Sequence, residues 1–117
     1  MRVEKIMNSP VTVTKGSNKV MHLKDLFARK EINAVPVLED DGTISGIVSA
    51  SDVAKCHDEE ELVKNIMSPH VHIVLKNNRV KDAAAIMTKH HIHHLVVMDE
   101  GDVVGMISSL DIVKVYS

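Results

Sequence analysis

The stretch Gly46-Ile47-Val48-Ser49-Ala50-Ser51-Asp52 recurs 59 positions later as Gly105-Met106-Ile107-Ser108-Ser109-Leu110-Asp111. Both copies read glycine, two apolar residues, serine, two variable residues and aspartate. The chain has 117 residues, so the second copy begins about half a chain after the first. A pattern that recurs at this distance indicates an internal duplication, which decides the fold more strongly than any single segment does.

The similarity between the two halves extends outward from this pattern through the whole chain. A shift of 60 residues aligns the residues before Asp41 with the second half, and a shift of 59 aligns those after it. Aligned identities include Val3 and Val63, Ile6 and Ile66, Met7 and Met67, Val11 and Val71, Gly42 and Gly101, and Lys55 and Lys114. The sequence therefore predicts two repeats, residues 1–59 and 60–117.

Both repeats are predicted to follow the order β-α-β-β-α. Asn18 and Asn78 are candidate N-caps of helices with one apolar face, and turn residues at Asp41-Gly42 and Glu100-Gly101 predict hairpins. Residues 58–66 are predicted to form a further helix between the repeats. The predicted strands are 11–13, 34–38 and 44–49 in the first repeat, and 71–73, 94–98 and 103–108 in the second. The expected fold class is α/β (α+β), with two repeats packed through their sheets as one pseudo-two-fold module.

Composition excludes several classes of function. The formal net charge is −2, which gives no electrostatic basis for binding nucleic acid or anionic lipid. Phe27 and Tyr116 are the only aromatic residues among FWY, so the core is expected to be aliphatic. The apolar runs are too short to span a bilayer, and no secretory leader is evident. The single cysteine, Cys56, forms no internal disulfide, so a cytoplasmic location is expected.

The order of segments resembles that of the cystathionine-β-synthase (CBS) domain family, here as a tandem pair or Bateman module. The resemblance rests on the repeated Gly-apolar-apolar-Ser-x-x-Asp pattern and on the strand and turn that precede it, Val35–Gly42 and Leu95–Gly101. It covers about residues 3 to 117. It implies a regulatory module, not an enzyme, that senses an adenosine-containing nucleotide in the cleft between the two repeats.

The serine and aspartate of the pattern have two interpretations. Ser49 with Asp52, and Ser108 with Asp111, can form capping boxes, which is the commoner use of this spacing. The same groups can bind phosphate and a ribose diol. The family resemblance favours the second interpretation, because CBS pairs use this aspartate for the ribose of adenosine ligands.

By resemblance, each repeat also contributes apolar residues to the other repeat's site. Ser108 and Asp111 would share a cleft with Val11, Thr12 and Ile32 of the first repeat. Ser49 and Asp52 would share a cleft with Val71, His72 and Ile92 of the second. Aliphatic walls of this kind suit adenine without aromatic stacking.

Four histidines cluster in the second repeat. His93 and His94 precede the apolar strand at the position where the family holds nucleotide phosphates, in a segment similar to that of the γ subunits of AMP-activated kinase. His94 replaces the usual arginine, so phosphate affinity is expected to depend on pH near neutrality. The alternative for His90 and His91 is a solvated helix end whose positive charge complements the helix dipole.

The expected ligand is AMP, ADP or ATP, ahead of S-adenosylmethionine or NAD, with no cofactor required. A homodimer and an unidentified effector protein are expected partners. Two alternatives stay open. One is a structural or protein-interaction module with unoccupied clefts. The other is a metal site built from His90, His91, His93 and His94, with Cys56 or His57.

Overall fold

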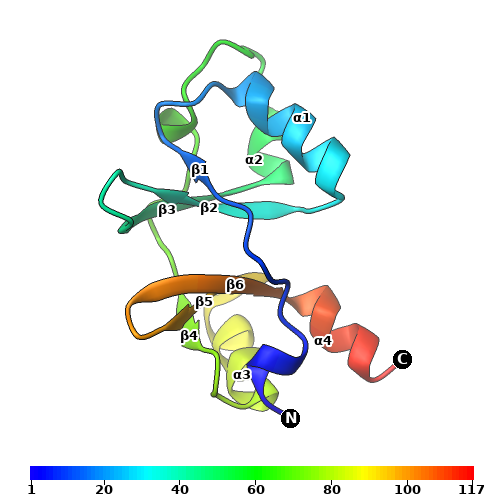
Figure 1. The fold of residues 1–117 in the computed structure, drawn as a ribbon. Coiled ribbons are helices and arrows are strands. Elements are labelled where there is room, and N and C mark those ends of the chain that lie inside the picture. Colours follow the sequence, from blue (N-terminus) through cyan, green and yellow to red (C-terminus); the bar gives the residue numbers. More distant parts are fainter. The chain divides into compact units, whose positions relative to one another are not determined.

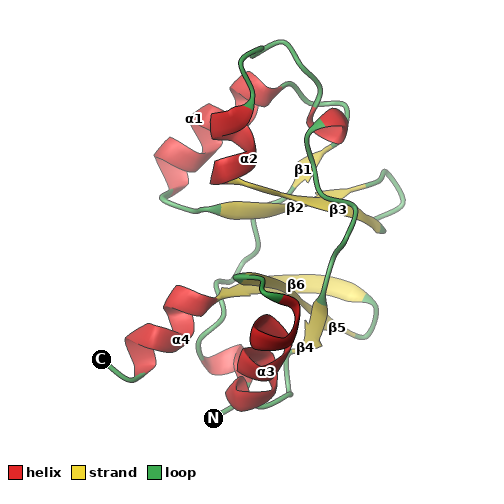
Figure 2. Ribbon diagram, turned by 180° about the vertical axis from the view of Figure 1, so that it is seen from behind, coloured by secondary structure: helices red, strands yellow, loops and turns green.

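The computed structural model describes residues 1–117 and contains two three-stranded sheets, each with helices on one face (Figures 1 and 2). The first repeat contains β1 (Thr14–Lys15), α1 (Val20–Lys30), β2 (Ala34–Leu38), β3 (Ile44–Ser49) and α2 (Ala50–Lys55). The second contains β4 (Ile73–Leu75), α3 (Val80–His90), β5 (His94–Asp99), β6 (Asp102–Ser108) and α4 (Ser109–Val115). The predicted β-α-β-β-α order of both repeats is confirmed.

The two sheets have the same topology. In each, a short first strand pairs parallel with the second, which pairs antiparallel with the third. Both hairpins even shift register at the same place, between Val37 and Leu38 and between Val97 and Met98. The parallel pair needs a crossover, which α1 and α3 provide. The two repeats identified in the sequence therefore also have the same strand pairing.

The compact units of the structure are not the two halves of the sequence. One unit, here the first-repeat unit, is Val13–Val71; the other, the second-repeat unit, joins Met1–Thr12 to His72–Ser117. The blue N-terminal segment accordingly lies with α3 and α4 in Figure 1. Val3 N donates to Asn78 O at 2.8 Å, and Val63 N donates to Asn18 O at 2.8 Å. Each repeat is therefore completed by a segment that precedes the other repeat in sequence.

Each unit has its own aliphatic core between its sheet and helices. In the first-repeat unit, Val63 lies fully buried among residues of α1, β2 and β3. In the second-repeat unit, Val3 occupies the corresponding place. Burial of one such side chain contributes about 1.5–3 kcal/mol, so these valines anchor the segments that carry them. Packing of the two sheets on each other remains a prediction.

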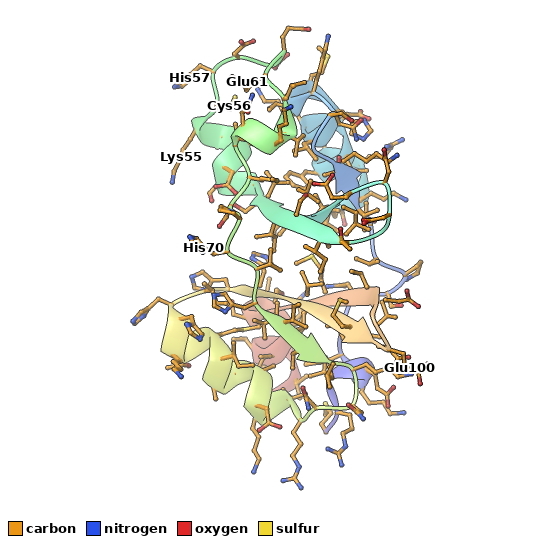
Figure 3. All side chains as sticks on the ribbon, turned by 90° about the vertical axis from the view of Figure 1, so that its left-hand side faces the viewer. Lys55, Cys56, His57, Glu61, His70 and Glu100 are labelled. Atoms are coloured by element: carbon orange, nitrogen blue, oxygen red, sulfur yellow. The ribbon has the colours of Figure 1, made fainter.

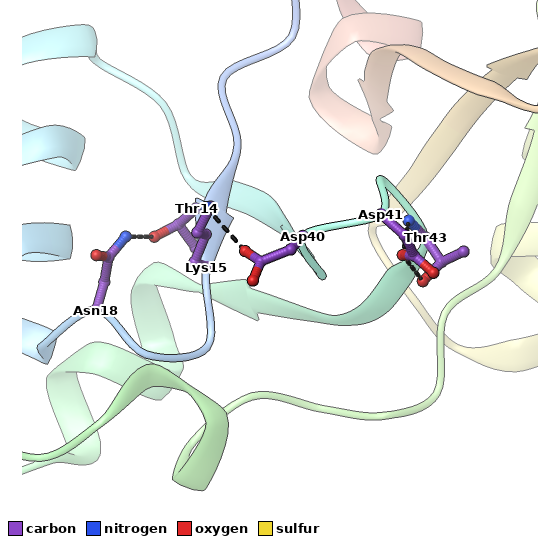
Figure 4. A network of polar contacts seen from close by, with 6 residues as sticks. All are labelled: Thr14, Lys15, Asn18, Asp40, Asp41 and Thr43. Atoms are coloured by element: carbon purple, nitrogen blue, oxygen red, sulfur yellow. Dashed lines mark hydrogen bonds and ion pairs between the residues drawn. The ribbon is translucent and has the colours of Figure 1, made fainter.

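The predicted asparagine caps are wrong. Helices α1 and α3 begin one residue later, with Lys19 and Arg79 at the N-cap positions and no capping bond from either side chain. Asn18 Nδ2 instead donates to Thr14 Oγ1 at 2.9 Å, one of the polar contacts in Figure 4. Asn78 Oδ1 accepts from Leu75 N at 2.9 Å. Both asparagines therefore stabilise the turn after the first strand, which is the other common use of this residue.

Two further element predictions are corrected. The first strands begin at Thr14 and Ile73, later than the predicted segments 11–13 and 71–73. Residues 58–66 are not a helix, apart from a single 3₁₀ turn at Val63–Asn65. The carbonyls of Glu59 and Glu61 accept from the first amides of α1, which draws this backbone out of a helical path.

The glycine of the repeated pattern is explained by a close backbone approach. A Cβ at position 105 would lie 2.8 Å from Asn8 O, and one at position 46 would lie 2.7 Å from Ser68 O. These contacts accompany backbone bridges between Asn8 and Met106 and between Ser68 and Ile47. Only glycine allows these two segments to run this close to the third strand of each sheet.

We expect Gly105→Ala to lower the free energy of unfolding by about 1–3 kcal/mol, because the clash is with backbone that cannot rotate away. Urea unfolding followed by circular dichroism measures the change. Ser45→Ala, which adds no atom to the equivalent strand β3, is the control and should cost about 1 kcal/mol or less. A wild-type midpoint for Gly105→Ala would contradict the requirement for glycine.

Candidate functional site

The residues predicted to bind phosphate and ribose in the second repeat do come together, at the end of the β5–β6 hairpin. His94 is directly opposite Ser108 in the strand register. Ser108 ends β6 and is the N-cap of α4, which places Asp111 in the first turn of that helix. We call these residues, together with His93 and Asn8, the Asp111 site.

Ser108 and Asp111 form a complete capping box. Ser108 N donates to Asp111 Oδ2 at 2.8 Å, and Asp111 N donates to Ser108 Oγ at 3.1 Å. The capping interpretation is therefore confirmed as local geometry. It uses only one oxygen of the carboxylate, because Oδ1 of Asp111 has no hydrogen-bond partner in the chain. The half-buried Oδ1 remains available to accept from a ligand.

Asn8 is part of this site, and the sequence analysis did not find it. Its Nδ2 donates to Asp111 Oδ2 at 3.1 Å across 103 residues of sequence. Its backbone is fixed by two hydrogen bonds with Met106, of 2.7 and 3.2 Å. The equivalent residue of the other repeat is Ser68, so no repeated pattern marks this position. The only signal is the adjoining identity of Met7 and Met67, which shows that the segment recurs.

The two histidines of the site differ in exposure. His93 is exposed, and its Nδ1 lies 3.3 Å from Ser109 Oγ. His94 is half-buried, and this burial lowers the pKa of its imidazole below the usual value; nearby His93 acts in the same direction and Asp111 opposes it. Near neutral pH His94 is therefore mainly uncharged, in contrast to the arginine that the family usually carries there.

The equivalent site of the first repeat has the same cap but no cation. Ser49 N and Ser49 Oγ donate to Asp52 Oδ2 at 2.8 and 3.0 Å, and Oδ1 is again without a partner. Ala34 stands opposite Ser49 where the second repeat has His94, and Asn33 stands where it has His93. This Asp52 site can accept from hydroxyl groups but has no basic side chain for a phosphate.

The apolar residues predicted to line the two sites are divided between the compact units. Val11 and Thr12 lie in the second-repeat unit with Asp111, and Val71 lies in the first-repeat unit with Asp52; all three are half-buried. The remaining predicted residues, Ile32 for the Asp111 site and His72 and Ile92 for the Asp52 site, belong to the opposite unit in each case. Their part in a site remains a prediction.

The histidines considered as metal ligands are spread over different elements. No three histidine, cysteine, aspartate or glutamate side chains in the chain are placed to hold one ion. His90 stacks on His72, with ring centroids 4.2 Å apart, and partial desolvation and then His72 lower the pKa of His90. Cys56 and His57 follow α2 in the first-repeat unit (Figure 3). Cys56 Sγ donates to Asp58 O at 3.3 Å.

A comparison with protein-family models identifies the family of the chain. The model for the CBS domain matches residues 3–59 and again residues 63–117, so the chain belongs to the CBS-domain family and is a tandem pair, or Bateman module.

None of the helices has the length and apolar character required to cross a membrane.

Curated relatives are longer than this chain. An uncharacterized protein of Methanocaldococcus jannaschii, MJ1232, is 35% identical over 94 residues, which is 79% of this chain and 31% of that protein. A homoserine O-acetyltransferase of Methanocorpusculum labreanum is 35% identical over 113 residues, which is 93% of this chain and 23% of that protein. The chain thus spans under a third of either relative.

Solved structures confirm the fold. The CBS domain pair of protein MJ0100, in complex with 5′-methylthioadenosine and S-adenosyl-L-methionine, superposes with a TM-score of 0.91 at 24% identity, covering 99% of this chain and 95% of that one. CBSX2 in complex with AMP gives a TM-score of 0.81 at 23% identity, covering 98% and 95%. Both complexes are properties of those proteins; for this chain the superpositions establish the fold.

We expect a double-mutant cycle of Asn8→Ala and Asp111→Ala to give a coupling energy of about 0.5–1 kcal/mol in urea unfolding, because the amide and carboxylate bond directly. The matched cycle, Ser68→Ala with Asp52→Ala, lacks such a bond and should be additive. Equal coupling in both cycles would contradict a specific role for Asn8.

Proposed function

We propose that this chain is a regulatory module that binds an adenine nucleotide, AMP, ADP or ATP, at the Asp111 site without catalysing a reaction. The observation that carries the proposal is the unpartnered carboxylate oxygen of Asp111 beside two histidines on one hairpin end. The carboxylate would accept hydrogen bonds from a ribose diol, while His93 and His94 would face the phosphate. No group in the proposed role needs to form or break a covalent bond.

The class of ligand is supported by related structures and by the residues present. MJ0100 and CBSX2 carry adenosine-containing ligands. In this chain Val11 and Thr12 belong to the same unit as Asp111 and offer an aliphatic side chain and a hydroxyl group to an adenosine ligand, while the part of Ile32 remains a prediction. S-adenosylmethionine and NAD are second choices, because S-adenosylmethionine has no phosphate for the histidines and NAD is larger.

The Asp52 site is proposed to take a less charged ligand or to stay empty. It repeats the cap and the free Asp52 Oδ1 but has Asn33 and Ala34 in place of the histidines. Without a basic side chain, a phosphate there would have to be held by backbone amides and Ser49 alone.

Regulation by such a module requires a partner. A bound ligand shifts a conformational equilibrium only by its difference in affinity for the two states, and the shift must be read by another chain. Helix α4 exposes Leu110 and Val113 by 52% and 58%, and its C-cap Tyr116 is exposed by 78%. The equivalent residues of the first repeat are Ser51, Ala54 and His57, so this apolar face is specific to the second repeat. We propose that it contacts a second copy or an effector protein, in the cytoplasm.

The same face favours a second candidate function, a protein-interaction module whose ligand sites are unoccupied. Ligand binding distinguishes the two candidates, because an interaction module would keep its α4 surface but show no response to nucleotides.

We expect AMP to raise the melting temperature of the wild-type protein, since a ligand present at 100 times its Kd adds about 2.7 kcal/mol to the stability of the folded state. Asp111→Ala should abolish the rise. Asp52→Ala is the matched control, because it removes an identical capping box and should lose similar stability while keeping the AMP response. An unchanged AMP response in Asp111→Ala would refute the assignment and favour the interaction module.

We expect AMP to bind more tightly as the pH falls from 7.5 to 6, by about threefold or more, because a phosphate favours the protonated imidazole. The stability of the free protein has the opposite pH dependence: it decreases as the pH falls. The lowered pKa of His94 means that the folded state binds fewer protons, so its contribution to stability is present above about pH 6.5 and is lost below it.

Isothermal titration calorimetry of wild type and His94→Asn at both pH values checks this effect. Because the AMP phosphate itself titrates in both experiments, the difference between wild type and His94→Asn reports only the effect of His94. Adenosine, which has no phosphate, should bind with an affinity that does not depend on pH. The same pH dependence in wild type and His94→Asn would exclude His94 as the phosphate contact.

A further inference from the structure

A cavity of the second-repeat unit, separate from the Asp111 site, is lined by basic side chains. It has a volume of about 460 Å³ and is lined by residues of the N-terminal segment, the start of α3 and the C-cap of α4. We call it the basic cavity; its lining is Met1, Arg2, Arg79, Val80, Lys81 and Tyr116. It contains no acidic residue and shares none with the Asp111 site.

Two arginines of this cavity are held opposite each other by the backbone. Arg2 and Arg79 form an isolated antiparallel bridge, flanked by hydrogen bonds from Val3 N to Asn78 O and from Val80 N to Met1 O, of 2.8 and 2.9 Å. Directly opposed residues project to the same face with their Cβ atoms about 5 Å apart, and like charges in this arrangement are destabilising. The fold therefore places two exposed arginines directly opposite each other at the edge of the cavity.

The basic residues of the cavity have no carboxylate partner in an ion pair. Arg2, Arg79 and Lys81 take part in none of the ion pairs of the structure. The carboxylate of Asp82 accepts from the backbone N of Arg79 at 3.1 Å and is not part of the cavity lining. Glu4, on the N-terminal segment, acts instead on Lys76, whose pKa is raised chiefly by its hydrogen bond with Asp99.

The first-repeat unit shows that the fold does not require this concentration of charge. Its equivalent bridge joins Lys19 to Leu62, an apolar residue in place of an arginine. Lys19 forms an ion pair with Glu60, and Lys24 forms one with Glu59 at 3.0 Å. One repeat thus neutralises the position that the other leaves positively charged.

We propose that the basic cavity binds a small anion with two or more phosphate groups. A guanidinium donates two parallel hydrogen bonds to paired phosphate oxygens, and two arginines on one rim suit neighbouring phosphates. Lys81 adds a point charge and the hydroxyl of Tyr116 a further donor. The volume falls in the range of about 300–1,000 Å³ that is typical of small-ligand sites.

The test uses inorganic pyrophosphate as the probe, titrated calorimetrically into the full chain at low ionic strength. We expect Arg2→Gln/Arg79→Gln to weaken binding by about tenfold or more, since charge-assisted hydrogen bonds are lost. The control Lys30→Gln/Lys55→Gln removes the same charge from exposed residues outside any ion pair and should change the Kd by less than about twofold. Asp111→Ala should bind pyrophosphate like wild type, which separates this cavity from the proposed nucleotide site.

Two sources of the phosphates are distinguished by ADP titrated into Asp111→Ala. Binding of ADP with the affinity of pyrophosphate identifies nucleotides as ligands of the cavity, and binding of pyrophosphate alone identifies an inorganic or non-nucleotide anion. A second readout is stability, because Arg2→Gln/Arg79→Gln removes a repulsion and should melt no lower than wild type. Absence of pyrophosphate binding to the wild type, or equal loss in the control variant, would overturn the proposal.

Discussion

The backbone pairing between Asn8 and Met106, and its counterpart between Ser68 and Ile47, is the contact on which the remaining structure depends. It fixes a segment from the start of the sequence against β6 in the second-repeat unit, and the segment after α2 against β3 in the first-repeat unit. The pairing requires glycine at position 105, and at position 46 in its counterpart, because a Cβ there would clash with the backbone of the paired segment. It also carries Val3 into an aliphatic core, sets the Asn8 amide on Asp111, and places Arg2 opposite Arg79.

Features that repeat within the chain were predictable from sequence, and features that depend on pairing between distant segments were not. The Ser108 and Asp111 geometry follows from three-residue spacing, and the hairpins follow from their turns. Asn8 was missed because its partner is 103 residues away and its repeat equivalent is a serine. Asn18 was assigned to the wrong role because asparagine serves both as a cap and in turns, and local sequence does not distinguish these uses.

The two repeats show how one scaffold acquires different electrostatics. Their strand pairing, capping boxes and register shifts coincide. Basic side chains without acidic partners gather in the second-repeat unit, at His93 and His94 and at the two opposed arginines. At equivalent positions the first-repeat unit has neutral residues or a lysine paired with glutamate. Divergence has therefore acted on surface charge while the aliphatic cores stayed alike.

The position of the completing segments also bears on where one repeat can be cut. A single repeat of about 60 residues, cut at residue 60, would contain Val63 but not the core into which that valine fits. The contiguous stretch Val13–Val71 contains both Val63 and that core, whereas the second-repeat unit must recruit Met1–Thr12 from the far end of the chain. The folding unit is therefore offset from the repeat in sequence, and a separately expressed repeat should be cut at Val13 and Val71.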